Sequence, residues 1–289
     1  MFSIIGQQIK DCSNNLALVQ LCESLQVARA SFYRDFEAMP DTDEMKLRDA
    51  IQRIALSWSS YGYRRITAQL KREGFCVNHK RVLRLMREDN LLCLRHKRGF
   101  IATTDSHHSF TVYPNLASEL ELSDINQLWV ADITYIRLQS EFIFLAVVMD
   151  AYSRRVVGWA ISKNIDTELT LAALRMALSG RKSLLGLVHH SDRGVQYAAS
   201  DYINELQANE IKISMSRRAN PYDNAQCERF MRTLKYEEVY LSEYENITEA
   251  KSSIGHFIEK VYNRKRLHSA LGYMPPAEFE RSLYQTIYP

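Results

Sequence analysis

The stretch LWVADITYIRL, residues 128–138, decides the fold, because it reads as a strand with a carboxylate near its centre. Its aromatic and β-branched residues are those most common in strands. Asp132 interrupts this apolar run, and a carboxylate in such company costs free energy unless a cation compensates its charge. The stretch therefore predicts a largely buried strand and an acid that packing alone does not explain.

Two more strand candidates follow directly. EFIFLAVVMDAYS, residues 141–153, and RVVGWAIS, residues 155–162, come after short polar breaks, which is the spacing of an antiparallel meander. Residues 166–180 then have a helical pattern that begins at an acidic cap and stops at Gly180. The series is completed by a strand in 186–192, a helix around 200–210, a strand in 211–216 and a helix from near Asp223. This order predicts an α/β fold, a mixed five-stranded sheet flanked by helices.

Charge is distributed unevenly along the 289 residues, although the net charge is only +3. Residues 51–100 carry 12 Lys and Arg against 3 Asp and Glu, a balance of +9, whereas residues 101–150 carry 1 against 7, a balance of −6. A basic block beside an acidic one is typical of a polyanion-binding module next to a carboxylate-rich one. The alternative is a solvated, charged helix face.

The bulk composition excludes several classes of protein. No apolar stretch reaches the roughly 18 residues that a membrane helix needs, and the N-terminus has no pattern of a secretion signal. The five cysteines are odd in number and never spaced as C-x-x-C, which argues against a disulfide framework and a zinc site. We therefore expect a cytoplasmic protein of about two domains, with free thiols and no membrane partner.

The basic block is helical in pattern and precedes the strands. In YGYRRITAQLKREGFCVNHKRVLRLMREDNLLC, residues 61–93, one helix can end at Gly74 and a second can start at Asn78. The second helix has an apolar stripe at positions 82, 83 and 86, and on another face it carries Lys80, Arg84 and Arg87. Two short helices with a basic outer face have the form of a DNA-reading unit.

Three acidic residues stand where they could meet at one edge of the sheet. Besides Asp132, Asp192 ends the later strand in VHHSDRGVQY, and Glu228 lies on a helix with Lys235 two turns further on the same face. Oxygen ligands from separate elements suit Mg²⁺ or Mn²⁺ rather than zinc, so the specific hypothesis is a two-metal phosphoryl-transfer site. Each acid also has a plain alternative, such as a turn cap for Asp192 or an ion pair with Arg232 for Glu228.

Other polar residues carry less weight. Asp150, at the end of the second strand, is interpreted as structural or as a support for the acids. The adjacent His189 and His190 could bind zinc, but no further cysteine or histidine stands at a suitable spacing.

Four blocks, WVADITYI, HSDRGVQY, NPYDNAQCERFMRTLKYEE and YNRKRLHSALGYMPPAEF, resemble in order those of DDE transposases from the large bacterial insertion-sequence family with two overlapping reading frames. The resemblance is to the second-frame product, whose core is similar to that of retroviral integrases. Between Asp132 and Asp192 lie 59 residues, and between Asp192 and Glu228 lie 35, which is spacing typical of this family. The resemblance covers roughly residues 10–280 and includes the helical segments before the core.

The resemblance implies an RNase H-like core in which Asp132, Asp192 and Glu228 bind metal and carry out catalysis. Two Mg²⁺ ions, which Mn²⁺ can replace, would activate a water or a 3′-hydroxyl for in-line attack at phosphorus. The implied function is a DNA transposase that cuts the ends of an insertion element and joins the 3′-hydroxyl to another strand. The expected DNA contacts are Arg64, Arg65, Lys80, Arg81, Arg84, Arg87, Lys235, Arg264 and Arg266.

Further residues are expected to support this site or to hold DNA. The set expected to support the acids is Asn224, Arg193 and His190. In the C-terminal tail, the residues expected to hold the DNA backbone or to form an interdomain contact are Asn263, Arg264, Arg266 and His268. Where many relatives have a small residue after the last acid, this chain has Arg229, which can alter local DNA contacts.

The expected domains are a helix-turn-helix element in 1–40, a second, basic one in 41–93, a connector in 94–126, the integrase-like core in 127–245, and a C-terminal helix with a basic tail in 246–289. Residues 37–44, EAMPDTDE, are interpreted as a linker. The expected partners are double-stranded DNA at the element ends and target, a second copy of the chain, and a first-frame protein or its frameshift fusion. The resemblance places the protein in the bacterial cytoplasm, at the nucleoid.

Two rival functions remain open. One is a catalytically inactive DNA-binding regulator derived from a transposase, and the other is an RNase H-like nuclease that hydrolyses without joining. The three acids favour an enzyme over the regulator. The basic helices favour a recombinase over a general nuclease, because a recombinase must hold particular DNA ends.

Overall fold

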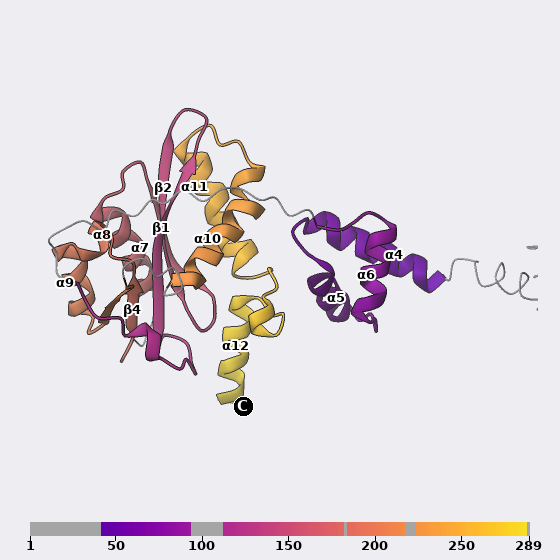
Figure 1. Cartoon of the computed structure of the whole chain (residues 1–289), viewed down its shortest axis with the longest axis horizontal. Coiled ribbons are helices and arrows are strands. Elements are labelled where there is room, and N and C mark those ends of the chain that lie inside the picture. Colours follow the sequence, from indigo (N-terminus) through magenta and orange to yellow (C-terminus); the bar gives the residue numbers. More distant parts are fainter. Residues whose placement is uncertain (1–41, 94–111, 182–183, 218–223, 288–289) are drawn as a thin grey trace, which may run out of the picture. The chain divides into compact units, whose positions relative to one another are not determined.

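The structure is a computed structural model that describes residues 42–93, 112–181, 184–217 and 224–287. The chain forms two compact units, Met1–Leu92 and Cys93–Pro289 (Figure 1). The helix-turn-helix predicted in 1–40 lies outside the described residues, as does the connector up to residue 111. Within the described ranges no helix is long and apolar enough to cross a membrane.

The first unit contains three described helices, α4 (Thr42–Ser57), α5 (Tyr63–Arg72) and α6 (His79–Glu88). Their shared core consists of Leu47, Ile51, Ile54, Tyr61, Ile66, Leu70, Val82, Leu85 and Met86. The two helices predicted in 61–93 are confirmed. The linker prediction is wrong at its end, because α4 begins at Thr42 and uses the acidic residues after it as its first turn.

The turn between α5 and α6 follows from the residues at its two ends. α5 stops before Gly74, whose φ of +91° is a conformation that glycine adopts without steric cost. The amide of Phe75 then donates to the carbonyl of Leu70 at 3.0 Å, which closes the helix end. Asn78 caps α6 by accepting from the amide of Lys80 at 2.9 Å. Both predicted helix boundaries are confirmed.

The second unit is built on one sheet with the strand order β3-β2-β1-β4-β5. β1 (Leu128–Arg137), β2 (Phe142–Asp150) and β3 (Val156–Ser162) form the predicted antiparallel meander. β4 (Val188–Ser191) and β5 (Lys212–Met215) are short and continue the sheet in parallel from β1. The expected mixed five-stranded α/β fold is confirmed, and β1 is its central strand.

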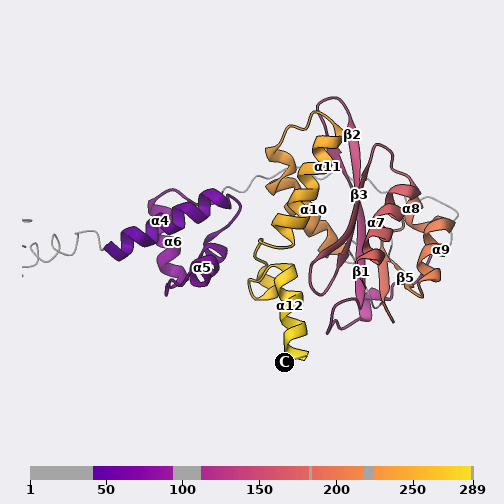
Figure 2. The same cartoon turned by 180° about the vertical axis from the view of Figure 1, so that it is seen from behind.

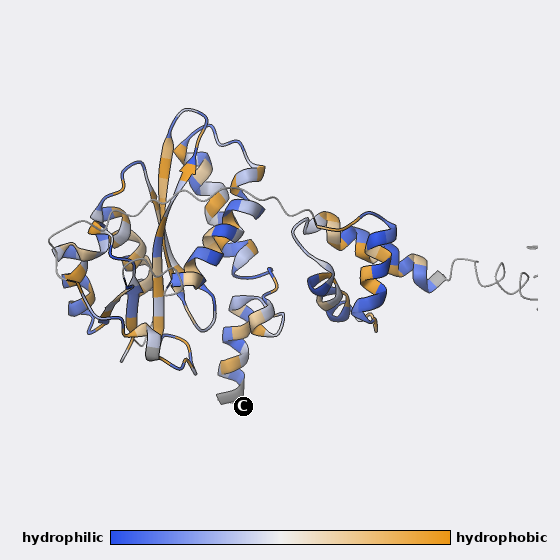
Figure 3. Cartoon of the chain, in the orientation of Figure 1, coloured by the Kyte–Doolittle hydropathy of each residue, from blue (hydrophilic) through white to orange (hydrophobic). Residues whose placement is uncertain are grey.

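Helices cover both faces of the sheet, which is seen nearly edge-on in Figure 1 and from behind in Figure 2. One face packs against α7 (Thr167–Ser179), α8 (Val195–Ala198) and α9 (Ser200–Ala208). The other packs against α10 (Ala225–Glu237) and α11 (Ile247–His256). Colouring by hydropathy shows the apolar residues concentrated along the strands and the polar residues on the outer turns of the helices (Figure 3).

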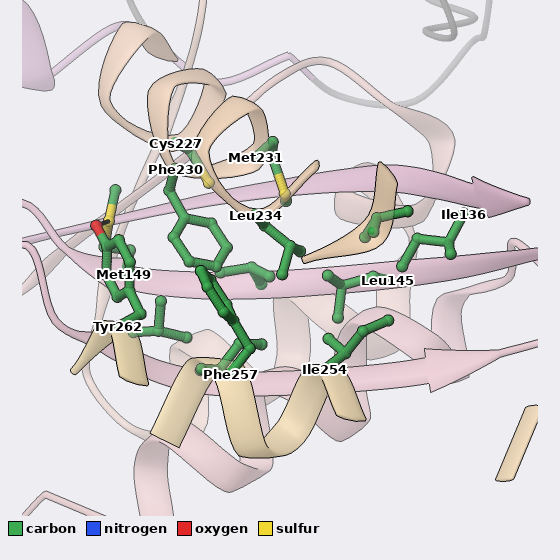
Figure 4. Packing of buried hydrophobic residues seen from close by; sticks show 14 of the residues in the cluster. Ile136, Leu145, Met149, Cys227, Phe230, Met231, Leu234, Ile254, Phe257 and Tyr262 are labelled. Atoms are coloured by element: carbon green, nitrogen blue, oxygen red, sulfur yellow. Dashed lines mark hydrogen bonds between the residues drawn. The ribbon is translucent and has the colours of Figure 1, made fainter. Parts of the chain in front are cut away.

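The core between the sheet and α10 fixes the position of that helix. Phe230 and Leu234 of α10 pack in one cluster with Leu145 of β2 (Figure 4). The same cluster contains Ile254 of α11 and Phe257 of the π-helix η4 (Phe257–Tyr262) that follows it. Each of these side chains is almost fully buried, and burial of one such side chain contributes about 1.5–3 kcal/mol. This packing fixes the distance between α10 and the sheet, and with it the position of the residues on the exposed side of α10.

The last helix, α12 (Pro276–Ile287), is joined to the end of β2 by buried polar contacts. Glu280 is 3% exposed and accepts from Arg181 at 2.6 Å and from the hydroxyl of Ser153 at 2.7 Å. The same hydroxyl donates to Asp150 at 3.0 Å, and Asp150 also accepts from three backbone amides. Asp150 is therefore a structural residue that organises the turn after β2.

Candidate active site

Asp132 extends from the middle of β1 toward the face that α10 covers. Side chains alternate along a strand, and Leu128, Val130 and Ile136 pack in the cluster that contains α10. Asp132 lies an even number of residues from each of these three, so its side chain points to the same face of the sheet. It is only partly exposed, and its Oδ1 accepts from the amide of Ile133 at 2.9 Å.

Asp192 directly follows β4, the parallel neighbour of β1. The two strands pair with a constant offset of 60 residues, from Leu128 opposite Val188 to Val130 opposite His190. Continued by two residues, this offset brings Asp192 level with Asp132, and Asp192 acts electrostatically on Asp132. β1 lies between β2, its antiparallel hairpin partner, and β4, the parallel strand reached by a crossover. Such a position is a switch point of the topology, and in α/β sheets ligands usually bind in the crevice beside it.

Gly194 holds the Asp192 carboxylate from the turn that follows β4. Its amide donates to Asp192 Oδ1 at 2.9 Å. A Cβ atom at Gly194 would also lie 2.9 Å from that oxygen, well inside the 3.5–4.0 Å that non-bonded atoms prefer. The carboxylate thus occupies the space that any larger residue at position 194 would need.

Glu228 and Lys235 reach the same region from α10. Glu228 stands in the first turn of the helix on its exposed side, and Lys235 is partly buried two turns later. The Lys235 ammonium lies 4.2 Å from the ring centroid of Tyr135 on β1, which is a cation–π contact. Both Glu228 and Lys235 act electrostatically on Asp132. The structure therefore brings together Asp132, Asp192, Glu228 and Lys235.

Burial and crowding raise the pKa of Asp132 to about 8. Burial is the largest cause, the neighbouring carboxylate of Asp192 comes next, and Glu228 adds to it. The amide of Ile133 and the ammonium of Lys235 lower the pKa but do not compensate. Asp132 on its own therefore favours the protonated form at neutral pH, and a further cation would stabilise its charge.

The chemistry of these donors fits a hard divalent cation. All three acids offer carboxylate oxygens, the ligands that Mg²⁺ and Mn²⁺ prefer, and a cation among them would relieve the mutual repulsion. In the part of the chain that the structure describes, no three acidic, histidine or cysteine side chains are arranged to ligate one ion together. Asp132 on β1 and Asp192 just after β4 are the pair best placed to start such a site.

Two buried residues near the acids each have one polar atom that forms no hydrogen bond with a described residue. Asn224, expected to support the acids, donates from Nδ2 to the carbonyl of Ala131 at 3.0 Å, and its Oδ1 has no partner among the described residues. Tyr197 on α8 is 3% exposed, and its hydroxyl likewise has no described partner. Burial raises the pKa of Tyr197, with contributions from Asp132 and Asp192. The sequence does not reveal Tyr197, since an aromatic residue on a short helix is ordinarily part of the core.

The zinc alternative for the two histidines is not supported, because they point to opposite faces of β4. His189 lies 2.9 Å from the hydroxyl of Tyr202, and burial lowers its pKa to about 3. His190 has its ring nitrogens 2.8 Å and 3.1 Å from the hydroxyls of Ser214 and Ser216. Both are histidines with satisfied hydrogen bonds in the core.

The predicted DNA contacts on α6 differ in how strongly they are already engaged. Arg81 and Arg84 both bond to Glu44 of α4, at 3.3 Å and 3.2 Å. Lys80 and Arg87 are exposed and form no ion pair with another described residue. On α5, the guanidinium groups of Arg64 and Arg65 each lie 5.5 Å from a tyrosine ring centroid.

The burial of Arg266 does not favour the prediction that it contacts DNA. Arg266 is 4% exposed and forms two hydrogen bonds of 2.7 Å with the carboxylate of Glu237 on α10, and a buried cation needs such a partner. Asn263, predicted with it, instead brackets the edge of the sheet, accepting from the amide of Val156 at 3.1 Å and donating to its carbonyl at 2.9 Å. Arg264 is exposed and remains a prediction.

Comparison with known proteins gives matches along most of the chain. Integrase core domain families match residues 123–221 and 209–276, and an HTH-like domain family matches residues 42–99. An uncharacterized 31 kDa protein of the insertion element IS600 from Shigella sonnei is 39% identical over 92% of this chain and 99% of that protein. The transposase InsF for insertion sequence IS3A of Escherichia coli (strain K12) is 33% identical over 90% of this chain and 92% of that protein. The solved catalytic core domain of BIV integrase is 23% identical, covering 57% of this chain and 99% of that structure at a TM-score of 0.42.

Proposed function

The chain belongs to the insertion-sequence transposases related to InsF, and on this premise we propose that Asp132, Asp192 and Glu228 are its catalytic residues. It is a DDE transposase, a polynucleotidyl transferase that acts on DNA. The observation that carries the proposal is the register of β1 with β4, which sets Asp132 beside Asp192 at the switch point of the sheet. Glu228 is included as the third acid because its charge raises the pKa of Asp132.

The proposed reaction cuts the ends of the element and joins the freed 3′-hydroxyl to another DNA strand. Three carboxylates alone would repel a phosphodiester, so they suit phosphoryl transfer only as holders of cations. We propose that they hold two Mg²⁺ ions, or Mn²⁺ in their place. When bound, these ions would favour ionisation of a water or 3′-hydroxyl and offset the charge that develops on the phosphoryl oxygens. Lys235, fixed against Tyr135, is placed to receive a phosphate oxygen of the same strand.

The helices before the core are proposed to hold the DNA. Lys80 and Arg87 on α6 are exposed and have no ion pair within the described part of the chain, and Arg84 can exchange its bond with Glu44 for a phosphate. Replacing Lys80, Arg84 and Arg87 with Ala should weaken DNA binding and reduce the slope of log affinity against log salt by about 1 per lost contact, because fewer counterions are released. A slope equal to that of the wild type would place the DNA elsewhere.

The assembly proposed for the reaction is at least a dimer, because one reaction has to hold two DNA ends. We also propose that a first-frame protein or its fusion takes part in recognising those ends, and that the protein works at the nucleoid, where its substrate lies. Sedimentation of the chain with and without end DNA tests the dimer, and a monomer on paired ends would contradict it.

The catalytic assignment is tested with Asp132→Asn, Asp192→Asn and Glu228→Gln in the full chain, with end DNA and Mg²⁺. Each variant should lose both cleavage and joining while binding DNA about as well as the wild type, since only the carboxylate charge is removed. Joining by any one variant would remove that acid from the proposal. Cleavage without joining by the wild type would favour the nuclease alternative, and inactivity of the wild type would favour the regulator.

A further inference from the structure

We propose that Arg154 and Arg229 together bind a phosphate group of the DNA strand beside the three acids. Arg154 lies in the turn between β2 and β3, and Arg229 follows Glu228 on α10. The inference rests on the proposed function, because the ligand is the strand on which the acids act. It adds a contact that positions the substrate without ligating metal.

Arg154 is held in a conformation that costs free energy. Its φ is +61°, in the left-handed region, which costs a non-glycine residue about 1 kcal/mol or more. Its side chain is half-buried, burial lowers the pKa of the guanidinium, and Arg229 lowers it further. The folded protein thus retains a charge that its own surroundings disfavour, which is common where a residue serves a ligand.

The other two arginines near this turn share one carboxylate as an ion-pair partner, whereas Arg154 has no ion pair among the described residues. Arg155 and Arg181 both bond to the carboxylate of Glu280, at 2.5 Å and 2.6 Å. Asp150 attracts Arg154 from the end of β2, but its oxygens are occupied by the amides and hydroxyl of the turn. Among the described residues Arg154 has no ion pair, and neither has Arg229, which is exposed.

Packing around Tyr262 brings the two arginines toward one space. The ring of Tyr262 packs edge-to-face on Phe230 of α10 at 4.7 Å, and its hydroxyl end points toward Met149 near the end of β2 (Figure 4). Arg154 interacts electrostatically with both Tyr262 and Arg229. The end of β2 and the part of α10 around Phe230, next to Arg229, are therefore linked through Tyr262.

An anion is the ligand that these groups call for chemically. Two guanidinium groups repel one another, and a phosphate bound between them would turn this repulsion into attraction. Arginine matches the geometry of a phosphate better than lysine does, because it can donate two parallel hydrogen bonds. The first turn of α10 adds the positive end of the helix dipole. A phosphodiester bound there would fix the strand next to Glu228.

The test compares Arg154→Gln and Arg229→Gln with the wild type in the full chain, binding a short DNA duplex of arbitrary sequence in EDTA over a range of salt concentrations. Each variant should bind about 3- to 10-fold more weakly and lose about 1 from the slope of log affinity against log salt. Arg175→Gln is the matched control, because Arg175 is an exposed arginine on α7, which covers the opposite face of the sheet. Wild-type slopes for both variants would overturn the proposal.

Two further measurements distinguish a role of Arg154 in DNA binding from a role in stabilising the fold. Arg154→Gly removes both the left-handed strain and the half-buried charge, so the Tm of the DNA-free protein should rise by about 2–4 °C while DNA affinity falls. A lower Tm would show that Arg154 serves the fold and would overturn the proposal. Inorganic phosphate that raises the Tm, combined with unchanged DNA binding by the variants, would reveal an anion site unconnected with DNA. Neither metal nor turnover enters these assays, so their failure is distinct from failure of the catalytic assignment.

Discussion

Asp132→Asn should make the metal-free protein more stable, although it removes a side chain on which the reaction is proposed to depend. The pKa of Asp132 is about 8 in the folded protein, against 3.8 for an ordinary aspartate. Between these two values the folded state keeps a proton that the unfolded state has released, so the free energy of unfolding decreases as the pH rises from about 4 to about 8. Below about pH 4, Asp132 is protonated in both the folded and the unfolded state, so it no longer lowers the free energy of unfolding. Asparagine imitates the protonated acid at every pH.

The size of the effect follows from the interval between the pH and the unfolded pKa. At pH 7 this interval is about three units, and at about 1.4 kcal/mol per unit the variant should gain about 4 kcal/mol. At pH 5 the interval from the ordinary value of 3.8 shrinks to about 1.2 units, and the gain should shrink to about 1.6 kcal/mol. Urea unfolding in EDTA at both pH values measures these gains. Asp201→Asn, which alters an exposed acid on α9, is the matched control and should change stability by less than about 0.5 kcal/mol.

Divalent metal should reverse the order of stability of the wild type and Asp132→Asn. Mg²⁺ that binds only the folded wild type raises its free energy of unfolding, and the variant, with a ligand removed, should gain less. Equal stability of the wild type and Asp132→Asn in EDTA at pH 7 would refute the reasoning about burial and repulsion. Equal stabilisation of both by Mg²⁺ would refute the role of Asp132 as a ligand.

Three glycine or cap substitutions test other parts of the structure. Gly194→Ala should slow strand joining about 10- to 100-fold with little change in Tm, because its Cβ would displace the Asp192 carboxylate 2.9 Å away; an unimpaired rate would contradict this. Gly158→Ala should cost about 3 kcal/mol or more in urea unfolding, since its Cβ would lie 2.1 Å and 2.8 Å from backbone atoms of α7, and a loss under about 1 kcal/mol would argue against so close a packing. Asn78→Ala should reduce hydrogen-exchange protection at the start of α6 by about 1 kcal/mol, with unaltered protection as the opposing result.

The antiparallel part of the sheet could be predicted from sequence because it depends on local patterns. The three strands of the meander are dense in β-branched and aromatic residues, and the short polar breaks between them favour pairing of consecutive strands. Asp132 was conspicuous as a charge within such a run. The register that sets it beside Asp192 depends on the length of a crossover, which the family resemblance supplied and the residues alone did not.

The fate of individual basic residues could not be predicted, because it depends on partners far away in the chain. Nothing local distinguishes exposed Arg264 from buried Arg266, and only Glu237, 29 residues earlier, makes the difference. Arg84 is similarly engaged by Glu44, 40 residues away, on a helix whose start resembled a linker. Charge patterning indicated that the block binds a polyanion but not which side chains remain free to do so.

The most direct test of the proposed metal-dependent site is the metal preference of Asp192→Cys in strand joining, measured on end DNA with Mg²⁺ or Mn²⁺. A thiolate is a soft ligand that Mg²⁺ accepts poorly and the transition metal Mn²⁺ tolerates better. The wild type should join DNA with either ion, Asp192→Asn with neither, and Asp192→Cys with Mn²⁺ only. Wild-type joining by Asp192→Cys in Mg²⁺, or none in Mn²⁺ by a variant that folds and binds DNA normally, would contradict a metal held by Asp192.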